Sequence, residues 1–451
     1  MKSRFGFIKI LSLLVAFAVF LTFFTGCTGN TGTENEESNS TAAETQNTGT
    51  TVPAQNPVGL TMLATKSSLH EGVLAELDAV KNNLGITIEI DYLPEDGGAN
   101  VVKTRIATNE MPDFFLFNSG ALLSTLNPET NFVDITNEPF MANVEETFKE
   151  AVSVNGKAFG IPAYSSTVGA WLYNKKIYSE LGLQVPRTWK ELLGNCEKIN
   201  AAGKVAIIGT YKDTWTAQLP VLADFYNVQA LTPDFVDNYN NNRAKYTNTP
   251  SALRSFEKMA DLKPYLNKEY LSTSYEEGQR MLAEGDGAHY PMLSQILPNI
   301  EEKYSDKVND IGAFAQPSDD AAINGITTWM PEAFYLSKSC MEVDSAKKFM
   351  EYYVSSEGIS IFLSKTKPMG PMLVKGVTLP SNVFPAVKEM MEYMNNGQSA
   401  PALEFSSSIK GPNLMQICIE VISGIKTAEQ GAQEYDKDVE KQAKQLNMPG
   451  W

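Results

Sequence analysis

The alternation that indicates the fold lies in residues 58–117, which read VGLTMLATKSSLHEGVLAELDAVKNNLGITIEIDYLPEDGGANVVKTRIATNEMPDFFLF. Residues 59–65 and 86–92 are rich in apolar and β-branched side chains, which predicts two strands. Between them, residues 70–83 repeat apolar side chains at helical spacing and stop before Gly85. This segment therefore predicts a strand, a helix and a second strand.

A second helix and a third strand complete the unit. The turn at residues 96–98 precedes a helical segment that reaches Asn109, and residues 114–117 form an apolar strand. The β-α-β-α-β order predicts a parallel sheet with right-handed crossovers. Ligands of such sheets bind beyond the carboxyl ends of the strands. Those ends are Lys66–Ser68, Leu93–Asp96 and Asn118–Ser119.

The rest of the chain continues the alternation and becomes helical toward its end, without an internal repeat. A sheet-rich first half and a helix-rich end are compatible with two α/β lobes. Further strands are predicted at 168–174, 205–210, 288–291 and 311–316, and helices at 189–202, 250–262, 343–354, 357–363, 383–394, 413–425 and 428–445.

The composition excludes several classes of function. The 451 residues hold 37 Lys and Arg against 53 Asp and Glu, a formal charge of −16. Nucleic acid and anionic membrane surfaces both attract basic proteins, so neither is expected as a direct partner. Histidine occurs only at positions 70 and 289, which argues against histidine-rich metal sites and most histidine-based catalysis. We expect no metal and no cofactor.

The N-terminus resembles a bacterial lipoprotein signal. Three basic residues precede the apolar run 10–24, which is too short for a comfortable membrane span. The run ends at Phe24-Thr25-Gly26-Cys27, similar to a lipobox in which Phe24 replaces the usual Leu and Cys27 receives the lipid. Ordinary secretion with cleavage nearby and an uncleaved anchor remain the alternatives.

A polar segment follows this signal. Residues 28–57 contain no Lys, Arg or aromatic residue, so they cannot bury enough surface to fold and are predicted to be a disordered tether. The lipid on Cys27 would then hold the protein on the extracytoplasmic face of the cell membrane, on a Gram-positive surface rather than in a periplasm. Cys196, Cys340 and Cys418 lack metal-site spacing and are expected as buried free thiols, with one disulfide as the alternative.

One long stretch resembles a known family. Residues 155–203 read NGKAFGIPAYSSTVGAWLYNKKIYSELGLQVPRTWKELLGNCEKINAAG. This is similar to the G-K…G-I-P…Y-N-K…P-x-T-W-x-E pattern of the extracellular solute-binding proteins of carbohydrate ABC importers, the family that includes maltose-binding protein. Weaker echoes at 106–113, with Asn109 for the common Gly, at 278–290 and at 333–358 follow in the family's order.

The resemblance implies an α/β fold of the type II periplasmic-binding-protein kind. Each of two lobes would hold a mixed, mostly parallel sheet flanked by helices, with a hinged cleft between the lobes. Lobe one is expected at 58–162 plus 326–368 and lobe two at 169–316 plus 372–451, with crossings near 163–168, 317–325 and 369–371.

The resemblance also implies a monomeric receptor that binds a mono- or oligosaccharide and delivers it to the transmembrane subunits of an ABC permease. A non-sugar solute or a sensor partner is the alternative. A surface glycoside hydrolase is a weaker alternative. It stays open because two carboxylates suffice for that reaction. The sequence contains no G-x-S-x-G, Walker loop or H-E-x-x-H motif, so we expect no enzyme.

Candidate ligand contacts combine aromatic faces for sugar rings with polar groups for hydroxyls. Packing remains the alternative for the aromatic residues and a turn for Glu95 and Asp96, while His289 is as well explained by a structural role and His70 is expected in solvent. The candidates are Lys66, Glu95, Asp96 and Asn118 at strand ends; Tyr164 in the first crossing; Tyr211, Asp213 and Trp215 after a strand; and Tyr290, Trp329 and Glu332.

Overall fold

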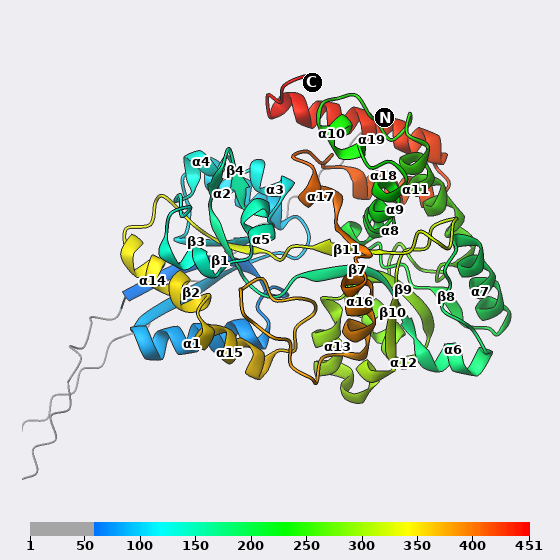
Figure 1. Cartoon of the computed structure of the whole chain (residues 1–451), viewed down its shortest axis with the longest axis horizontal. Coiled ribbons are helices and arrows are strands. Elements are labelled where there is room, and N and C mark those ends of the chain that lie inside the picture. Colours follow the sequence, from blue (N-terminus) through cyan, green and yellow to red (C-terminus); the bar gives the residue numbers. More distant parts are fainter. Residues whose placement is uncertain (1–57) are drawn as a thin grey trace, which may run out of the picture. The chain divides into compact units, whose positions relative to one another are not determined.

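The computed structural model describes residues 58–451. The predicted signal peptide, the lipidated Cys27 and the tether lie outside the described residues. Within residues 58–451, no helix is both long and apolar enough to cross a bilayer. Two large sheets with separate hydrophobic cores make up most of this part of the chain, and β4 (Ser153–Val154) and β5 (Lys157–Ala158) form a third, two-stranded sheet (Figure 1).

The first sheet has the strand order β2-β1-β3-β12-β6. β1 pairs in parallel with β2 and with β3, so the predicted parallel β-α-β-α-β unit is confirmed. β12 and β6 extend the sheet with antiparallel pairings, which makes it mixed. The strands are β1 (Val58–Thr65), β2 (Ile86–Leu93), β3 (Phe114–Phe117), β6 (Gly160–Pro162) and β12 (Ala333–Leu336).

Helices from two parts of the chain that are distant in sequence cover this first sheet. α1 (Glu71–Leu84) ends at Gly85, whose left-handed φ of 68° suits a residue without a Cβ. α15 (Ser356–Lys365) packs on α1, and a Cβ on Gly72 would lie 2.7 Å from the Phe362 ring (Figure 1). The close approach of these two helices therefore depends on glycine. The other helices of this half are α2 (Gly98–Ala107), α3 (Ala121–Ser124), α4 (Pro128–Asn131), α5 (Glu146–Ala151) and α14 (Val343–Tyr353).

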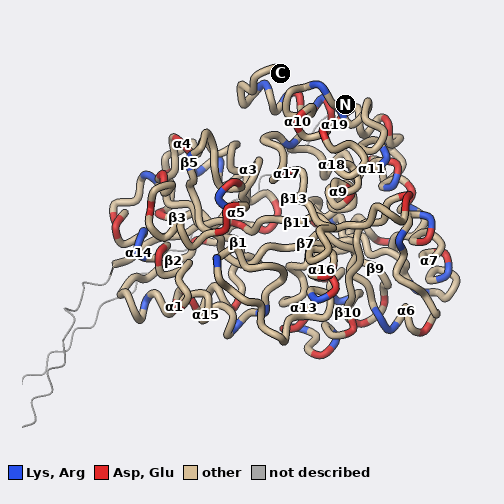
Figure 2. The backbone as a smooth tube through the Cα atoms, viewed as in Figure 1, with Lys and Arg blue, Asp and Glu red and all other residues tan. Residues whose placement is uncertain are grey.

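The second sheet is built around β7 (Thr167–Asn174), every residue of which is buried. β7 pairs antiparallel with β9, β10 and β11, while β8 joins β9 and β13 joins β11 in parallel. In Figure 2 the central strands carry no acidic or basic colour, because a charge there would lose its hydration. The partners are β8 (Val205–Ile207), β9 (Gly287–Leu293), β10 (Ile311–Phe314), β11 (Ile326–Trp329) and β13 (Ser399–Pro401).

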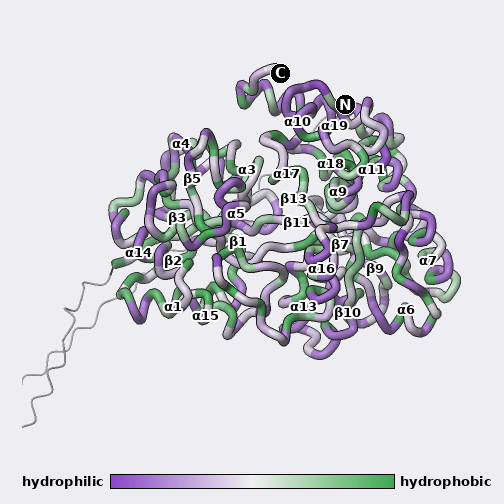
Figure 3. Tube along the Cα trace, in the orientation of Figure 1, coloured by the Kyte–Doolittle hydropathy of each residue, from purple (hydrophilic) through white to green (hydrophobic). Residues whose placement is uncertain are grey.

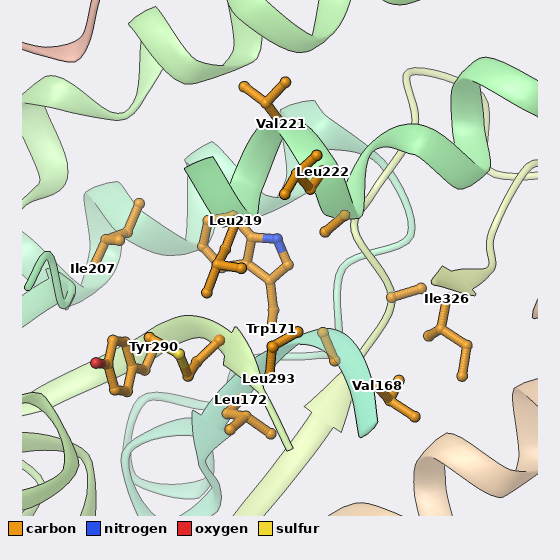
Figure 4. Packing of buried hydrophobic residues seen from close by; sticks show 14 of the residues in the cluster. Val168, Trp171, Leu172, Ile207, Leu219, Val221, Leu222, Tyr290, Leu293 and Ile326 are labelled. Atoms are coloured by element: carbon orange, nitrogen blue, oxygen red, sulfur yellow. The ribbon is translucent and has the colours of Figure 1, made fainter. Parts of the chain in front are cut away.

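Trp171 of β7 is central to the second core. Its ring is fully buried and stacks on Phe314, and Leu219 lies beside it, while Leu172 points to the other face of the sheet (Figure 4). Trp189 packs edge-on against Trp171 at 6.1 Å. Burial of rings of this size contributes strongly to the stability of a core.

Amphipathic helices surround the second sheet. α7 (Trp189–Ala201) begins with a capping box in which Thr188 and Glu191 satisfy each other's backbone N–H, which fixes the start of the helix. α18 (Leu414–Ile422) is rich in apolar residues (Figure 3). The others are α6 (Lys175–Leu181), α8 (Leu219–Ala223), α9 (Phe225–Leu231), α10 (Phe235–Asn240), α11 (Pro250–Asp261), α12 (Tyr275–Glu284), α13 (Ile296–Tyr304), α16 (Pro385–Asn395), α17 (Leu403–Ser406) and α19 (Ala428–Gln445).

The structure corrects one detail of the sequence predictions and confirms another. The strand predicted at 205–210 stops at Ile207, because the amide of Gly209 donates to the side chain of Asn267 instead of a neighbouring strand. Cys196, Cys340 and Cys418 are buried and free, as expected.

A buried ion pair anchors the segment that leads out of the second sheet after β10. Lys258 Nζ lies 2.6 Å from Asp224, and both side chains are almost fully buried. The same ammonium donates to the carbonyl of Pro317 at 2.9 Å, so the pair fixes the start of the predicted crossing 317–325. The lobe boundaries stay a prediction; Met372, Leu373 and Val374 pack in the core of the first sheet.

Glu76 is an unpaired acid in the first core. Its side chain is fully buried, neither carboxyl oxygen has a donor, and it lines a cavity of about 10 Å³ beneath Pro162–Tyr164. The neighbouring Tyr353 hydroxyl donates to the carbonyl of Ala163 at 2.6 Å and is therefore not free to donate to Glu76. Burial raises the pKa of Glu76 well above its ordinary value.

Replacing Glu76 with Met should stabilise the protein increasingly as the pH rises. Because the pKa is raised in the folded state, the wild-type stability is fully present below the ordinary pKa of 4.5 and is lost as the pH rises toward the folded-state value. We expect Glu76→Met to unfold with a free energy about 1–3 kcal/mol higher at pH 8, measured by urea denaturation. Glu71→Met, at an exposed position, should change it by less than about 0.5 kcal/mol. An unchanged stability of Glu76→Met at pH 8 would contradict the assignment.

Candidate functional site

Two chain crossings meet beside the first sheet and form one wall of the candidate site. The carbonyl of Glu332 accepts the amide of Ala163 at 3.0 Å, next to the β6–β12 pairing. The Tyr164 hydroxyl donates to the Glu332 carboxyl group at 3.1 Å. Backbone and side chain of one residue therefore join Tyr164, in the first predicted crossing, to the segment between β11 and β12.

The environment of Glu332 favours its neutral form. Burial raises its pKa to about 7, hydrogen bonds from Ser68 and Tyr164 oppose the rise, and the charge of Glu95 adds to it. The carboxyl group can therefore donate or accept a hydrogen bond near neutral pH. Glu332 and Tyr164 were both predicted as ligand contacts, and the structure brings them together.

The prediction that His70 lies in solvent is wrong. Its ring packs edge-on against Tyr164 at 5.1 Å, and it is half-buried rather than in solvent. The reason is its place directly before α1, where β1 delivers the chain to the edge of the sheet. Burial lowers the pKa of His70 to about 4, so the imidazole is neutral at physiological pH.

The carboxyl ends of the first-sheet strands supply polar groups. Glu95 accepts hydrogen bonds from the amide of Ser67 at 3.0 Å and from its hydroxyl at 2.6 Å, which ties the end of β2 to the end of β1. Lys66, Asp96 and Asn118 are exposed at the same ends. These are the positions at which parallel sheets bind ligands.

The opposing wall comes from the second sheet and its helices. Trp215 is half-buried and packs against Tyr275 with ring centres 5.3 Å apart. Asp213 accepts the backbone amide of Tyr275, the first residue of α12, at 2.6 Å. The loop that carries two predicted contacts is thereby fixed to the start of a helix.

The pKa of Tyr275 is influenced by groups of both walls. Burial raises its pKa, hydrogen bonds from Gln295 and Asn299 oppose this, and the negative charge of Glu95 raises it further. Tyr275 also contributes to the raised pKa of Tyr164, after burial and Glu332. The pKa of Tyr275, on the second-sheet side, is thus influenced by Glu95 at the end of β2, and Tyr275 in turn influences Tyr164.

Three predicted aromatic contacts are buried behind the walls. Tyr211 packs edge-on against Tyr270, and the Tyr290 hydroxyl lies 2.9 Å from that of Thr210. The Trp329 indole donates to Glu404 at 2.9 Å, and its side chain is 5% exposed. These rings have little free face, so their assignment as ligand contacts stays a prediction.

His289 is held by structure on both sides. Its Nδ1 lies 2.8 Å from the carbonyl of Ala206 and its Nε2 lies 2.7 Å from the Tyr178 hydroxyl. The side chain is fully buried, and burial lowers its pKa to about 4. This satisfies the imidazole without a ligand.

The sequence predictions missed several groups that the fold brings to the walls. Tyr275 stands at the start of an amphipathic helix, where Ser274 forms the N-cap, and that signal marks only a helix start. Gln295 and Asn299, which oppose the rise in the pKa of Tyr275, are ordinary polar residues around the start of α13. No pattern along the chain distinguishes them from solvent-facing residues.

The arrangement is suited to reversible recognition of a polar molecule with apolar faces. Aromatic side chains offer faces, while carboxyl, amide and hydroxyl groups offer both donors and acceptors. Among residues 58–451, no group of three His, Cys, Asp or Glu side chains is placed to hold a metal ion.

Comparisons with known proteins agree with this geometry. The family model for the bacterial extracellular solute-binding proteins matches residues 64–359. A multiple sugar-binding protein of Streptococcus mutans is 24% identical over 318 residues, which are 68% of this chain and 72% of the relative. A putative binding protein of Brucella abortus is 27% identical over 127 residues, 27% of this chain and 30% of that protein.

Solved structures share the fold over most of the chain. A chitin oligosaccharide binding protein superposes with a TM-score of 0.74 at 21% identity and covers 85% of this chain and 98% of its own. RafE in complex with raffinose superposes with a TM-score of 0.70 at 19% identity and covers 85% and 99%. The two-lobed fold of family 1 solute-binding proteins is thus the fold of this chain.

A glycine under the Trp329 ring should be needed for stability. A Cβ on Gly169 would lie 2.0 Å from this ring, which Glu404 holds in place, so Gly169→Ala must displace it. We expect a loss of about 1–3 kcal/mol of unfolding free energy and altered tryptophan fluorescence. The control is Gly194→Ala, where a Cβ meets nothing within 4 Å in α7; it should be neutral or stabilising. Equal stability of the two variants would contradict this packing.

Proposed function

The chain belongs to the family of bacterial extracellular solute-binding proteins, and on that premise we propose that it captures a mono- or oligosaccharide between its lobes and delivers it to an ABC permease. It binds without catalysing, and a lipid on Cys27 holds it at the extracytoplasmic face of the membrane. Its partners are the solute and the transmembrane subunits of the importer.

The observation that carries the proposal is the pairing of an aromatic wall with a polar one. Trp215 and Tyr275 offer ring faces on the second lobe, while Glu95, Glu332 and Tyr164 offer hydrogen-bonding groups on the first. A pyranose presents apolar C–H surfaces and a rim of hydroxyls, so it needs both kinds of group. An inorganic ion would not use a broad ring face in this way.

Close contacts between the lobes support capture by closure. A Cβ on Gly120, at the end of β3, would lie 2.3 Å from the carbonyl of Glu404 in α17. Lys367 and Glu301 form an ion pair between the end of the first core's helices and α13. A solute held by both lobes contacts all its partners only when they close, so it shifts the population toward the closed state.

The ligands named for similar proteins support a sugar. The Streptococcus mutans relative is named for multiple sugars, and the solved structures are described with raffinose and with chitin oligosaccharide. These differ in ring number and linkage, so they support the class of solute for this chain and no individual sugar. A non-sugar solute is the second candidate, and calorimetry separates the two by a panel of sugars against amino acids, peptides and polyamines.

Trp215→Ala should weaken sugar binding. Loss of the ring face removes about 1–3 kcal/mol of stacking and burial, which corresponds to roughly a 5- to 150-fold higher Kd. The measurement is isothermal titration calorimetry with raffinose, stachyose, chitin oligosaccharides and galactose. Trp451→Ala, which removes a half-buried ring packed against Tyr239 near the C-terminus, is the matched control and should keep the wild-type affinity. Tight sugar binding by Trp215→Ala would show that Trp215 is not a contact.

Cys27→Ala should release the protein from the membrane. Without the thiol no lipid can be attached, and the polar segment that follows has no apolar surface with which to bind a bilayer. Fractionation of cells that express each form should move the variant to the soluble or secreted fraction. Cys196→Ala, at a buried free thiol, serves as the control and should remain in the membrane fraction. Persistent membrane attachment of Cys27→Ala would contradict the lipid anchor.

A further inference from the structure

Glu332 lies where the chain passes from the second sheet to the first. It lies between β11 of the second sheet and β12 of the first, so the chain changes lobe at this residue. Its carbonyl holds the amide of Ala163 and its carboxyl group holds the hydroxyl of Tyr164. One residue therefore ties together two of the segments about which the lobes would move.

The carboxyl group of Glu332 has no basic partner. Within residues 58–451, no ion pair includes Glu332, Glu95 or Lys66. The groups that face it are Ser68, Tyr164 and the carboxylate of Glu95, and its charge also acts on Tyr335. His70 packs against Tyr164, whose pKa is also raised by Tyr275 of the second lobe, after burial and Glu332. A negative charge at Glu332 would thus meet one like charge and no opposite one.

Glu404 shows what a neutralised carboxylate looks like in the same region. Its side chain is buried, whereas that of Glu332 is half-buried, and it accepts a hydrogen bond from an aromatic donor, the indole of Trp329. It forms an ion pair with Lys410, whose side chain is 9% exposed. The chain provides a cation for one carboxylate and none for the other, so the two acids respond differently to the removal of water.

We propose, resting on the proposed function, that Glu332 is a positioning residue which couples solute capture to the uptake of one proton from solvent. Closure covers Tyr164 and Glu332 with the wall that carries Tyr275 and removes the water that would solvate a carboxylate. An unpaired carboxylate beside Glu95 opposes that step, whereas a carboxylic acid does not. The closed, solute-bound state therefore holds the proton on Glu332, and opening returns it to solvent.

The direction of the pH dependence follows from this linkage. With the walls facing each other, burial raises the pKa of Glu332 to about 7, against an ordinary value of 4.5 in a solvated state. A raised pKa in the closed state favours closure at low pH, and this advantage is lost as the pH rises through about 7. His70 has a pKa of about 4 and stays neutral throughout this range, so it does not produce the profile.

The experiment measures solute affinity and proton uptake across this range. Calorimetry of the full chain with the tightest-binding sugar of the panel is performed between about pH 5.5 and 8.5, in two buffers of different ionisation enthalpy. We expect the wild-type Kd to rise at least about tenfold from the lower to the higher pH, and proton uptake to be measurable near pH 7. Glu332→Gln keeps the shape of the neutral acid and cannot ionise, so its Kd should be the same at both pH values and its binding should take up no proton.

Two variants serve as matched controls. Glu110→Gln removes an exposed acid of the first lobe and should retain the wild-type pH profile. Glu76→Gln alters the other acid whose pKa is raised, behind the same crossing, and should also retain it. A profile that disappears in Glu76→Gln and persists in Glu332→Gln overturns the proposal.

The failure of this proposal is distinguishable from that of the proposed function. Sugar binding with a pH-independent Kd overturns the coupling and leaves the sugar receptor standing. If no sugar binds, small-angle scattering of the ligand-free chain decides: the wild type should be more compact at about pH 5.5 than at 8.5, and Glu332→Gln equally compact at both. Scattering that is the same at both pH values in the wild type then overturns the coupling as well.

Discussion

The hydrogen bonds that join Glu332 to Ala163 and Tyr164 are the constraint on which the candidate site depends. They hold two chain crossings in register at the edge of the first sheet. The tyrosine ring so placed packs against His70, which directly precedes α1. Without this tie the aromatic and polar walls would lose their common base.

The acids within the folded part of this protein differ in whether a cation lies beside them. Lys258 and Asp224 form a buried pair that fixes the start of a crossing, and Lys410 neutralises Glu404 under Trp329. Glu76 and Glu332 are the two acids whose pKa values are raised, and neither has a cation. Glu76 lies inside the first core, while Glu332 lies beside the passage of the chain from β11 of the second sheet to β12 of the first.

Local patterns predicted the elements well where a single physical cause controls them. The parallel unit of β1, β2 and β3 follows from alternating strands and helices, and Thr188 follows from its capping pattern. Asn109, which stands where similar proteins have glycine, adopts a φ of 58°, a conformation that asparagine tolerates. The strand at 205–207 was predicted too long because a tertiary contact from Asn267 ended it.

The sequence by itself determined the alternation of elements, the family pattern and the strand ends where polar groups collect, because these depend on neighbours along the chain. Only the tertiary structure decided which aromatic rings have a free face. Trp215 remains half-buried although its ring packs against Tyr275. Trp329, Tyr211 and Tyr290 are covered by partners distant in sequence. The direction of a side chain depends on contacts between segments a hundred or more residues apart, and spacing along the chain carries no information about them.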